Sequence, residues 1–289
     1  MRCCATKHWV HGGPELTELQ KHRKEVEQVL RDEFGDAPRI REGGSKAKGT
    51  MIKESYDLDL SSYFAHDDDS AGATLEEIYD RTESALAKKY ATVSKGSAIR
   101  VRDPDQDADL HVDVVPGRFV KGKDGDVFLH RTTGDKERLK TNLDVHVAHV
   151  KESGVIDAIR LMKLWREREK LQVKTFVLEL LVVKLLTDKK DASLTDQLLH
   201  VWTEFRDHAG DLAVEDPANP EGNDLSDLLN DEVRSQLSAA AGRTLGTIDQ
   251  SGWQAVFGEV EEDEEGRIAA LKRIAVATPS KTKPWASRD

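Results

Sequence analysis

Three aspartates carry the clearest chemical signal in this sequence. Asp57 and Asp59 stand two residues apart in residues 57–60, where polar and apolar side chains alternate as they do in a strand. Neighbouring side chains of a strand point to opposite faces, so both carboxylates leave the same face. Carboxylates held side by side repel each other unless a cation neutralises them, and Mg²⁺ prefers such oxygen ligands. The spacing therefore predicts a divalent-metal site on these two residues.

The third aspartate, Asp113, lies among valines in residues 110–115. An aspartate in such a strand projects from the face opposite the core, and it needs a partner or a metal ion there. Three carboxylates of this kind would hold two Mg²⁺ ions, with Mn²⁺ as an alternative. One ion would activate a hydroxyl group, and the other would steady a leaving pyrophosphate.

Gly44 and Ser45 add a candidate site for phosphate groups. They stand where a strand gives way to a helix. Glycine lets the backbone approach a ligand closely, the N–H groups at the start of a helix favour an anion, and the serine hydroxyl is a further donor. A Gly-Ser pair alone usually marks a turn, and an Asp-x-Asp pair alone is usually surface charge. The order and spacing of all three motifs favour a triphosphate site instead.

The elements that would position these residues form an α/β part followed by a helical part. Residues 16–30 show helical spacing, and Thr74 with Glu77 makes a capping box for a helix that runs to about residue 90. Alternating patterns predict strands at residues 57–60, 97–101, 110–115 and 127–131. From residue 141 onward the apolar spacing predicts helices at residues 143–152, 154–168, 175–186, 194–208, 226–241 and 252–259. We therefore expect two domains, residues 1–140 and residues 141–289, with a loose tail from about residue 278.

Composition narrows the choice of partners and compartment. The chain carries 54 acidic against 43 basic residues, a net charge of −11, which argues against a surface that coats DNA or RNA. Any nucleotide must therefore meet a local basic cleft. Cys3 and Cys4 have no partners with the spacing of a zinc site or a disulfide framework. No signal peptide is recognisable, and the apolar run at residues 176–186 is too short to span a bilayer. We expect a soluble, cytoplasmic protein without membrane association.

The motifs together resemble a known family. The run GGSKAKGTMIKESYDLDL, followed by ADLHVDVVPGR, is similar to the polymerase-β-type nucleotidyltransferases. Within them it most resembles the CD-NTases, the cGAS-like and oligoadenylate-synthase-like enzymes that make nucleotide second messengers. The run VEDPANP at residues 214–220 resembles the DPA-P loop of that branch. The resemblance implies a polymerase-β-like core with a mixed β-sheet and a C-terminal helical domain that closes the nucleotide cleft.

The resemblance also implies a role for each site residue. Asp57 and Asp59 would ligate both metal ions, and Asp113 would complete the site and assist deprotonation of the attacking hydroxyl. Ser45 would hold the triphosphate of the donor nucleotide. Lys163 lies in a helix similar to the family's (R/K)xxKxW pattern and would contact the γ-phosphate. The alternative for Lys163 is a surface lysine.

Three other polar residues are interpreted as structural. His146 and His149 share one helix face, but no convincing third metal ligand accompanies them. Glu179 lies inside the apolar run and is predicted to pair with a basic neighbour.

The resemblance implies an enzyme that joins nucleoside triphosphates into a cyclic or short linear oligonucleotide and releases pyrophosphate. The expected setting is bacterial anti-phage signalling, with a regulatory partner protein and a downstream effector that senses the product. Two alternatives stay open, namely nucleotidyl transfer to a tRNA, protein or small molecule, and a catalytically silent nucleotide-binding module. The chain lacks a Cys/His insertion like that of animal cGAS, so we expect no direct DNA binding. The bases used, the linkage and the oligomeric state are open at this point.

Overall fold

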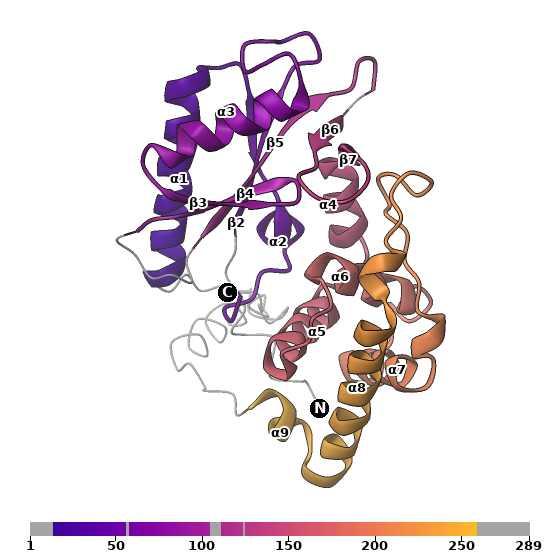
Figure 1. The fold of residues 1–289 in the computed structure, drawn as a ribbon. Coiled ribbons are helices and arrows are strands. Elements are labelled where there is room, and N and C mark those ends of the chain that lie inside the picture. The colour runs from indigo at the N-terminus through magenta and orange to yellow at the C-terminus, as the bar shows by residue number, and fades with distance from the viewer. Residues whose placement is uncertain (1–13, 56–57, 105–110, 124, 259–289) are drawn as a thin grey trace, which may run out of the picture.

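The computed structural model of the protein describes residues 14–55, 58–104, 111–123 and 125–258. These residues form a seven-stranded sheet beside a group of helices (Figure 1). The strands are β1 (Arg39–Glu42), β2 (Leu58–Phe64), β3 (Ala91–Lys95), β4 (Ala98–Arg102), β5 (Val112–Phe119), β6 (Asp126–His130) and β7 (Arg138–Asn142). The helices are α1 (Pro14–Phe34), α2 (Gly44–Lys48), α3 (Leu75–Ala87), α4 (Leu143–Lys151), α5 (Ile156–Glu169), α6 (Thr175–Leu185), α7 (Leu194–Asp207), α8 (Asp231–Ser251) and α9 (Trp253–Phe257), with the 3-10 turns η2 (Ala209–Asp211) and η3 (Ser226–Leu229).

The sheet is mixed, as the resemblance implied. Its strands follow the order β1-β2-β5-β4-β3, and β6 pairs with both β5 and β7. β2 and β5 run parallel, whereas the other pairs are antiparallel. The four predicted strands correspond to β2, β4, β5 and β6.

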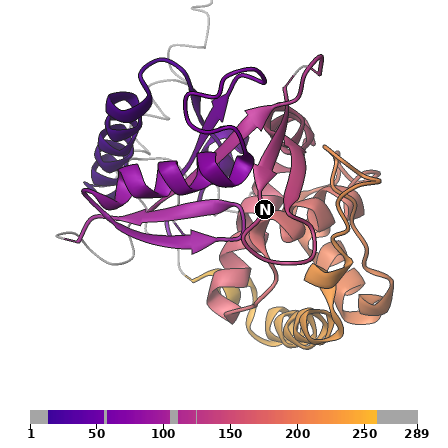
Figure 2. The same ribbon diagram turned by 45° about the horizontal axis from the view of Figure 1, so that its top comes forward.

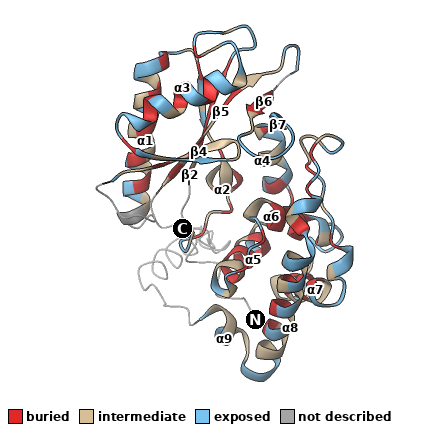
Figure 3. Cartoon of the chain, in the orientation of Figure 1, coloured by how far each residue is buried: buried red, intermediate tan, exposed pale blue. Residues whose placement is uncertain are grey.

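α1 and α3 cover one face of the sheet and bury its apolar side chains (Figure 3). Leu58 and Leu60 of β2 lie in this core. Val112 and Val114 of β5 lie beside them. The residues between these apolar positions therefore lie on the opposite face. On that side β2 packs against α2, and α2 packs against α4.

The helices from α5 to α8 enclose a second core. Trp165 of α5 packs against Trp202 and Phe205 of α7. The Trp165 indole N–H also donates a hydrogen bond of 2.8 Å to the Thr244 hydroxyl of α8, so its polar atom is satisfied inside the core. Figure 2 shows these helices, coloured from pink through orange to yellow, on the opposite side of the molecule from the indigo α1.

Most of the predicted elements are confirmed, but β3 and β7 were missed, and β1 was expected only as the strand before Gly44, without bounds. The capping box is present, because the Thr74 side chain accepts from the Glu77 N–H and the Glu77 carboxylate accepts from the Thr74 N–H. The predicted helices correspond to α1 and to α3 through α9, except that the one at residues 226–241 is divided into η3 and a longer α8. These three strands lie at ends of the strand order. Such edge strands favour charged residues, which hide the alternation that marks a strand.

Two other expectations concern the whole chain. None of the helices in the described ranges is long and apolar enough to cross a membrane. The division of the chain at residue 140 stays a prediction, because β7 extends across this position and leads directly into α4.

Candidate active site

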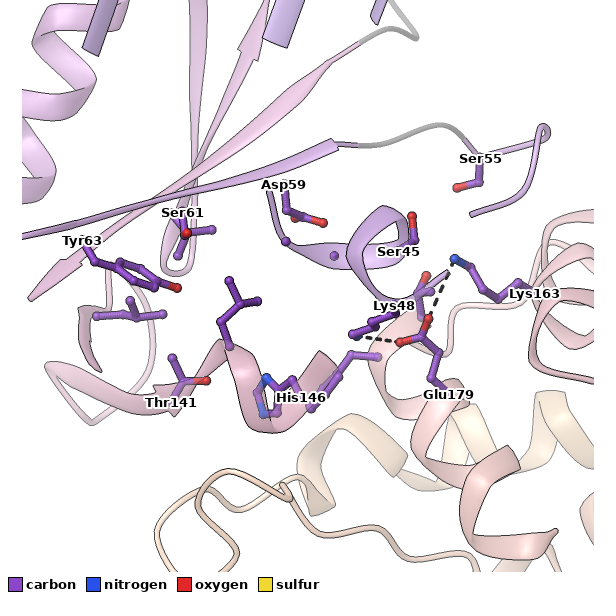
Figure 4. A pocket seen from close by; sticks show the side chains of 17 residues that line it. Ser45, Lys48, Ser55, Asp59, Ser61, Tyr63, Thr141, His146, Lys163 and Glu179 are labelled. Carbon is purple, nitrogen blue, oxygen red and sulfur yellow. Dashed lines mark hydrogen bonds and ion pairs between the residues drawn. The ribbon is translucent and has the colours of Figure 1, made fainter. Parts of the chain in front are cut away.

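A cavity of about 320 Å³ separates the polar face of the sheet from the helices (Figure 4). The sheet side of the cavity is lined by residues of β2, β5, β6 and β7 and by the turn into α2. The helix side is lined by α4, α5 and α6. The lining residues are Gly43, Gly44, Ser45, Lys48, Ser55, Asp59, Ser61, Tyr63, Val115, Leu129, Thr141, Leu143, His146, Lys163, Thr175, Phe176 and Glu179.

The turn between β1 and α2 lies directly against Asp59. The Gly43 N–H donates a hydrogen bond of 2.8 Å to the Asp59 carbonyl oxygen. Gly44 has a φ of +57°, and a Cβ atom there would lie 1.5 Å from the Asp59 Oδ2 atom. Glycine is therefore required at this position by backbone conformation and by space. The next residue, Ser45, begins the buried side of α2, so the predicted strand-to-helix junction is present.

Asp59 and Asp113 occupy neighbouring positions in the sheet. They are register partners in the parallel pair of β2 and β5, so their side chains share one face. Asp113 is also the register partner of Arg100 on β4. The Arg100 guanidinium binds the Asp113 carboxylate through two hydrogen bonds of 2.8 Å each. A row of two carboxylates and one guanidinium thus extends across three strands.

Two of the three predicted carboxylate ligands lie side by side in this row, as a hard divalent cation requires. The two neighbouring carboxylates of Asp59 and Asp113 are the oxygen ligands that Mg²⁺ prefers. Asp57, the third predicted ligand, lies outside the described residues. Among the residues that are described, no group of three or more His, Cys, Asp or Glu side chains forms a metal site. The predicted site with three carboxylates therefore stays a prediction.

Lys163 is buried rather than on the surface, so the surface-lysine alternative is wrong. It is 3% exposed, and its Nζ atom donates a hydrogen bond of 3.0 Å to the Thr50 carbonyl oxygen. The same Nζ lies 3.9 Å from the Glu179 Oε1 atom. Lys163 lines the cavity together with Ser45 and Asp59 (Figure 4). The predicted contact of Lys163 with a γ-phosphate stays a prediction.

Glu179 pairs with a basic neighbour, as predicted from the sequence. The carboxylate is 1% exposed and accepts hydrogen bonds of 2.7 Å from the Lys48 Nζ and 2.6 Å from the Thr50 hydroxyl. Lys48 and Thr50 belong to the segment around α2, whereas Glu179 belongs to α6. This buried network therefore joins the sheet side of the cavity to the helix side (Figure 4).

Several residues were missed at the sequence level, namely two that line the cavity and Arg100, which binds Asp113. Lys48 and Arg100 showed no functional signal in the sequence, although a lone arginine between buried Ile99 and Val101 could have indicated a partner on the same face of the sheet. Tyr63 is a further lining residue, and burial together with the charge of Asp59 raises the pKa of its hydroxyl well above the usual value. Tyr63 is therefore a neutral hydrogen-bonding group at physiological pH.

The two histidines of α4 differ in position. His146 lines the cavity, and its Nε2 atom lies 2.6 Å from the Asp216 Oδ1 atom of the loop that resembles the DPA-P motif. His149, one turn further along α4, is exposed and does not line the cavity. Thr175, the first residue of α6, also lines the cavity.

Known proteins share this fold. No protein-family model matches the chain. The chain is 25% identical over 250 residues to the cyclic AMP-AMP-AMP synthase of Escherichia coli (strain MS 115-1), and the match covers 73% of each protein. The structure of the E. coli MS115-1 CdnC:HORMA-deltaN complex matches with a TM-score of 0.64 and 21% identity, covering 89% of this chain and 95% of that one. The Bradyrhizobium diazoefficiens CD-NTase CdnG in complex with GTP matches with a TM-score of 0.64 and 14% identity, covering 95% and 96%.

These matches confirm the predicted fold class, an α/β core of the polymerase-β type followed by a helical part. The same chain carries the Gly44-Ser45 turn next to Asp59 and the aspartate pair in the sheet. In its motifs, its fold and its match to the curated relative, the chain is similar to the CD-NTase family of nucleotidyltransferases.

Proposed function

We propose that the protein joins nucleoside triphosphates into a cyclic or short linear oligonucleotide second messenger and releases pyrophosphate. The observation that carries this proposal is the Gly44-Ser45 turn against Asp59 at the cavity between sheet and helices, with Asp113 as the register partner of Asp59 on the neighbouring strand. The curated relative is a synthase of a cyclic trinucleotide, which supports the same class of product.

The residues of the sheet side would position the reacting groups. Ser45 and the turn before α2 would hold the triphosphate of the donor nucleotide, with its α-phosphate toward Asp59. Asp57, Asp59 and Asp113 would hold two Mg²⁺ ions, which supply charge neutralisation and activation of the attacking hydroxyl when bound. The hydroxyl oxygen of one nucleotide forms a bond to the α-phosphorus of another, and the bond from this phosphorus to the pyrophosphate breaks. Alignment of the two groups supplies much of the rate.

Arg100 would keep Asp113 oriented while the site is empty of metal. Its two hydrogen bonds fix both carboxylate oxygens, which otherwise would lie beside Asp59 without compensation. The guanidinium can continue to hold one oxygen of Asp113 while the other oxygen ligates an ion. We therefore propose that Asp113 is the ligand whose charge is shared between a metal ion and the protein.

The basic residues of the cavity would bind the outer phosphates. Two ammonium groups, those of Lys48 and Lys163, lie near the single carboxylate of Glu179. Among the lining residues, the charges of Lys48 and Lys163 match those of Asp59 and Glu179, in a protein whose net charge is −11. The cavity is therefore less acidic than the protein as a whole, and its two ammonium groups are the cations that would meet phosphate groups. We propose Lys163 as the contact to the γ-phosphate.

A proposal for the cellular role rests on the family resemblance. We propose that the product acts in bacterial anti-phage signalling, through an effector that senses it in the cytoplasm. One of the similar structures is a complex with HORMA-deltaN, which supports the prediction of a regulatory partner protein.

The test is a product analysis with the purified protein. The protein is incubated with all four nucleoside triphosphates and either Mg²⁺ or Mn²⁺, and an Asp57→Ala/Asp59→Ala double variant serves as the control. After phosphatase treatment, chromatography and mass spectrometry identify the products. We expect a metal-dependent cyclic or oligomeric nucleotide that the control does not make. Consumption of one triphosphate only after addition of tRNA or protein would favour transfer to that acceptor. Metal-dependent binding without turnover would favour the silent module.

A further inference from the structure

His146 connects the cavity to a loop that does not itself line it. Its side chain is 17% exposed and lies on the helix side of the cavity, across from Asp59 (Figure 4). The Nε2 atom is 2.6 Å from the Asp216 Oδ1 atom. The Asp216 side chain is 5% exposed, so the contact is made at a buried carboxylate. Burying a carboxylate costs free energy unless it is paired and hydrogen-bonded, so this contact differs from a solvated pair on the surface.

The loop around Asp216 is built to present this carboxylate. Asp216 accepts hydrogen bonds of 2.8 Å from the Ala218 N–H and 2.7 Å from the Asn223 side-chain amide. The Asn223 amide also donates to the Lys140 carbonyl oxygen of β7 at 2.9 Å. The loop is therefore anchored to the strand that leads directly into α4, the helix of His146.

These contacts define which nitrogen of His146 carries a hydrogen. Burial alone would raise the pKa of Asp216, but the hydrogen bonds from His146 and Asn223 outweigh it and leave this pKa below the usual value. Asp216 is thus an ionised acceptor at neutral pH, so the His146 Nε2 atom must be the donor. One ring nitrogen is committed to the loop, and this fixes the orientation of the ring.

The residues that line the cavity around the His146 ring indicate which part of a nucleotide this ring would contact. Ser45 and the two lysines mark the phosphate end. Toward the other end the lining includes the apolar side chains of Val115, Leu129 and Leu143. The His146 ring lies 5.0 Å from the ring of Phe176, and the Lys48 Nζ atom lies 5.3 Å from the centre of the Phe176 ring, so the two rings line the helix side next to the lysines. Aromatic and apolar walls with a few fixed polar groups are typical of sites for planar heterocycles.

We propose that His146 contacts the base of a nucleotide bound in this cavity, and that Asp216 is the positioning residue that holds the His146 ring in place. The inference rests on the proposed function, because it takes the ligand to be a substrate nucleotide. It gives the loop at residues 216–223 a role at the active site, although the loop acts only through His146.

The experiment compares four variants in the full chain. His146→Ala removes the proposed contact, and Asp216→Asn keeps the shape of the positioning residue without its charge. The double variant His146→Ala/Asp216→Asn tests whether the two act together. His149→Ala is the matched control, because it removes the same type of residue from the same helix outside the cavity. Thermal unfolding shows that each variant is folded.

Two measurements follow for each variant and each of the four nucleoside triphosphates. The first is KM and kcat, and the second is the Kd of a non-hydrolysable analogue by titration calorimetry. We expect His146→Ala to raise KM and Kd by about tenfold, the scale of about 1.4 kcal/mol of binding, and to change the preference among bases. Asp216→Asn should raise them in the natural background but not in the His146→Ala background. His149→Ala should change them less than about twofold.

The outcomes separate this inference from the proposed function. Product formation by the natural protein, with unchanged KM and base preference in His146→Ala, would overturn the inference alone. An equal effect of Asp216→Asn in both backgrounds would show that Asp216 acts on the fold and not through His146. If no product forms, a weaker Kd in His146→Ala would still support the base contact while the synthase proposal fails. If the natural protein binds no analogue, both proposals are rejected.

Discussion

The two sides of the cavity are assembled in different ways. On the sheet side, Gly44 and Asp59 are close in sequence, and their contact follows from a tight turn and a strand. On the helix side, Glu179 binds Lys48 and Thr50, which precede it by 131 and 129 residues in the chain. The contacts of the sheet side therefore follow from local chain geometry, whereas the contacts of the helix side follow from tertiary packing.

This difference has a functional consequence. The carboxylates of the sheet side project from β2 and β5, and the opposite face of these strands packs into the core under α1 and α3. Removing one of them should affect turnover more than folding. The Glu179 carboxylate is itself buried between the two halves of the molecule, so removing it should affect folding as well. Mutations on the two sides therefore test whether catalysis and stability are divided in this way.

The largest expected effect is that of Asp59→Asn. The amide keeps the shape of the side chain but loses the charge that neutralises a cation, so we expect kcat to fall by about a hundredfold to a thousandfold, the scale seen when one stabiliser of transition-state charge is removed. The melting temperature should change little. Rates of oligonucleotide formation and thermal unfolding measure the two effects. Asp80→Asn, at an exposed aspartate of α3, is the control. Comparable activity in the Asp59 and Asp80 variants would refute the site.

Glu179→Gln should have the next largest effect, and it should act on stability. The change leaves the buried Lys48 ammonium without its carboxylate partner at 2.7 Å. Breaking a buried pair by removal of one partner costs about 3 kcal/mol or more of unfolding free energy. Urea unfolding measures this loss. Glu169→Gln breaks a more exposed pair with Arg243 and should cost no more than about 0.5 kcal/mol. Equal losses in the two variants would show that the network on the helix side does not stabilise the fold.

The same contrast explains what could be predicted from the sequence. The aspartates of β2 and β5 were found because a strand has a period of two residues, and that period fixes which face a side chain occupies. The parallel pairing that makes Asp59 and Asp113 register partners was not readable from spacing, because it depends on the order of strands in the sheet. Arg100 was missed for the same reason, since its role depends on a neighbouring strand.

On the helix side, sequence patterns identified residues but not their partners. Glu179 stood out as a charge in an apolar helix, yet its partner Lys48 lies in the α2 segment. His146 was interpreted as structural because no third metal ligand accompanied it and His149, and its partner Asp216 lies 70 residues further along the chain. Pairs of this kind form only after the two halves pack together, so helical periodicity alone does not reveal them.

Two glycine substitutions, one at each end of α2, test the contact between the turn and Asp59. Gly44 and Gly49 both have positive φ, +57° and +76°, so alanine at either should cost about 1–2 kcal/mol of stability. A Cβ at Gly49 would meet nothing within 4 Å, whereas at Gly44 it would collide with the Asp59 carboxylate. We expect Gly44→Ala alone to reduce kcat strongly, because Asp59 must move. Thermal unfolding measures the loss of stability in each variant, and steady-state kinetics measures the loss of kcat. Equal activity of both variants would contradict the close contact between the turn and Asp59.

The smallest expected effect tests whether pH acts at the cavity or on the far face of the sheet. His22 of α1 is buried against Tyr90, with ring centroids 5.1 Å apart. Burial lowers the pKa of His22 below its value of 6.5 in the unfolded chain. Above pH 6.5 both states carry the neutral ring. As the pH falls below 6.5, the unfolded chain binds a proton that the folded protein resists. The free energy of unfolding should therefore decrease by up to about 1.4 kcal/mol per pH unit.

His22→Leu should remove this slope without changing kcat, because His22 belongs to the core on the face opposite the cavity. The measurement is urea unfolding of both proteins at pH 7.5, 6.5 and 5.5, with activity assayed at each pH. A smaller difference in stability between pH 6.5 and 5.5 in the variant would assign the slope to His22. The same slope in both proteins would assign it to another titratable group. The activity profile decides between them, because titration of a cavity residue changes turnover as well as stability, whereas titration of His22 changes stability alone.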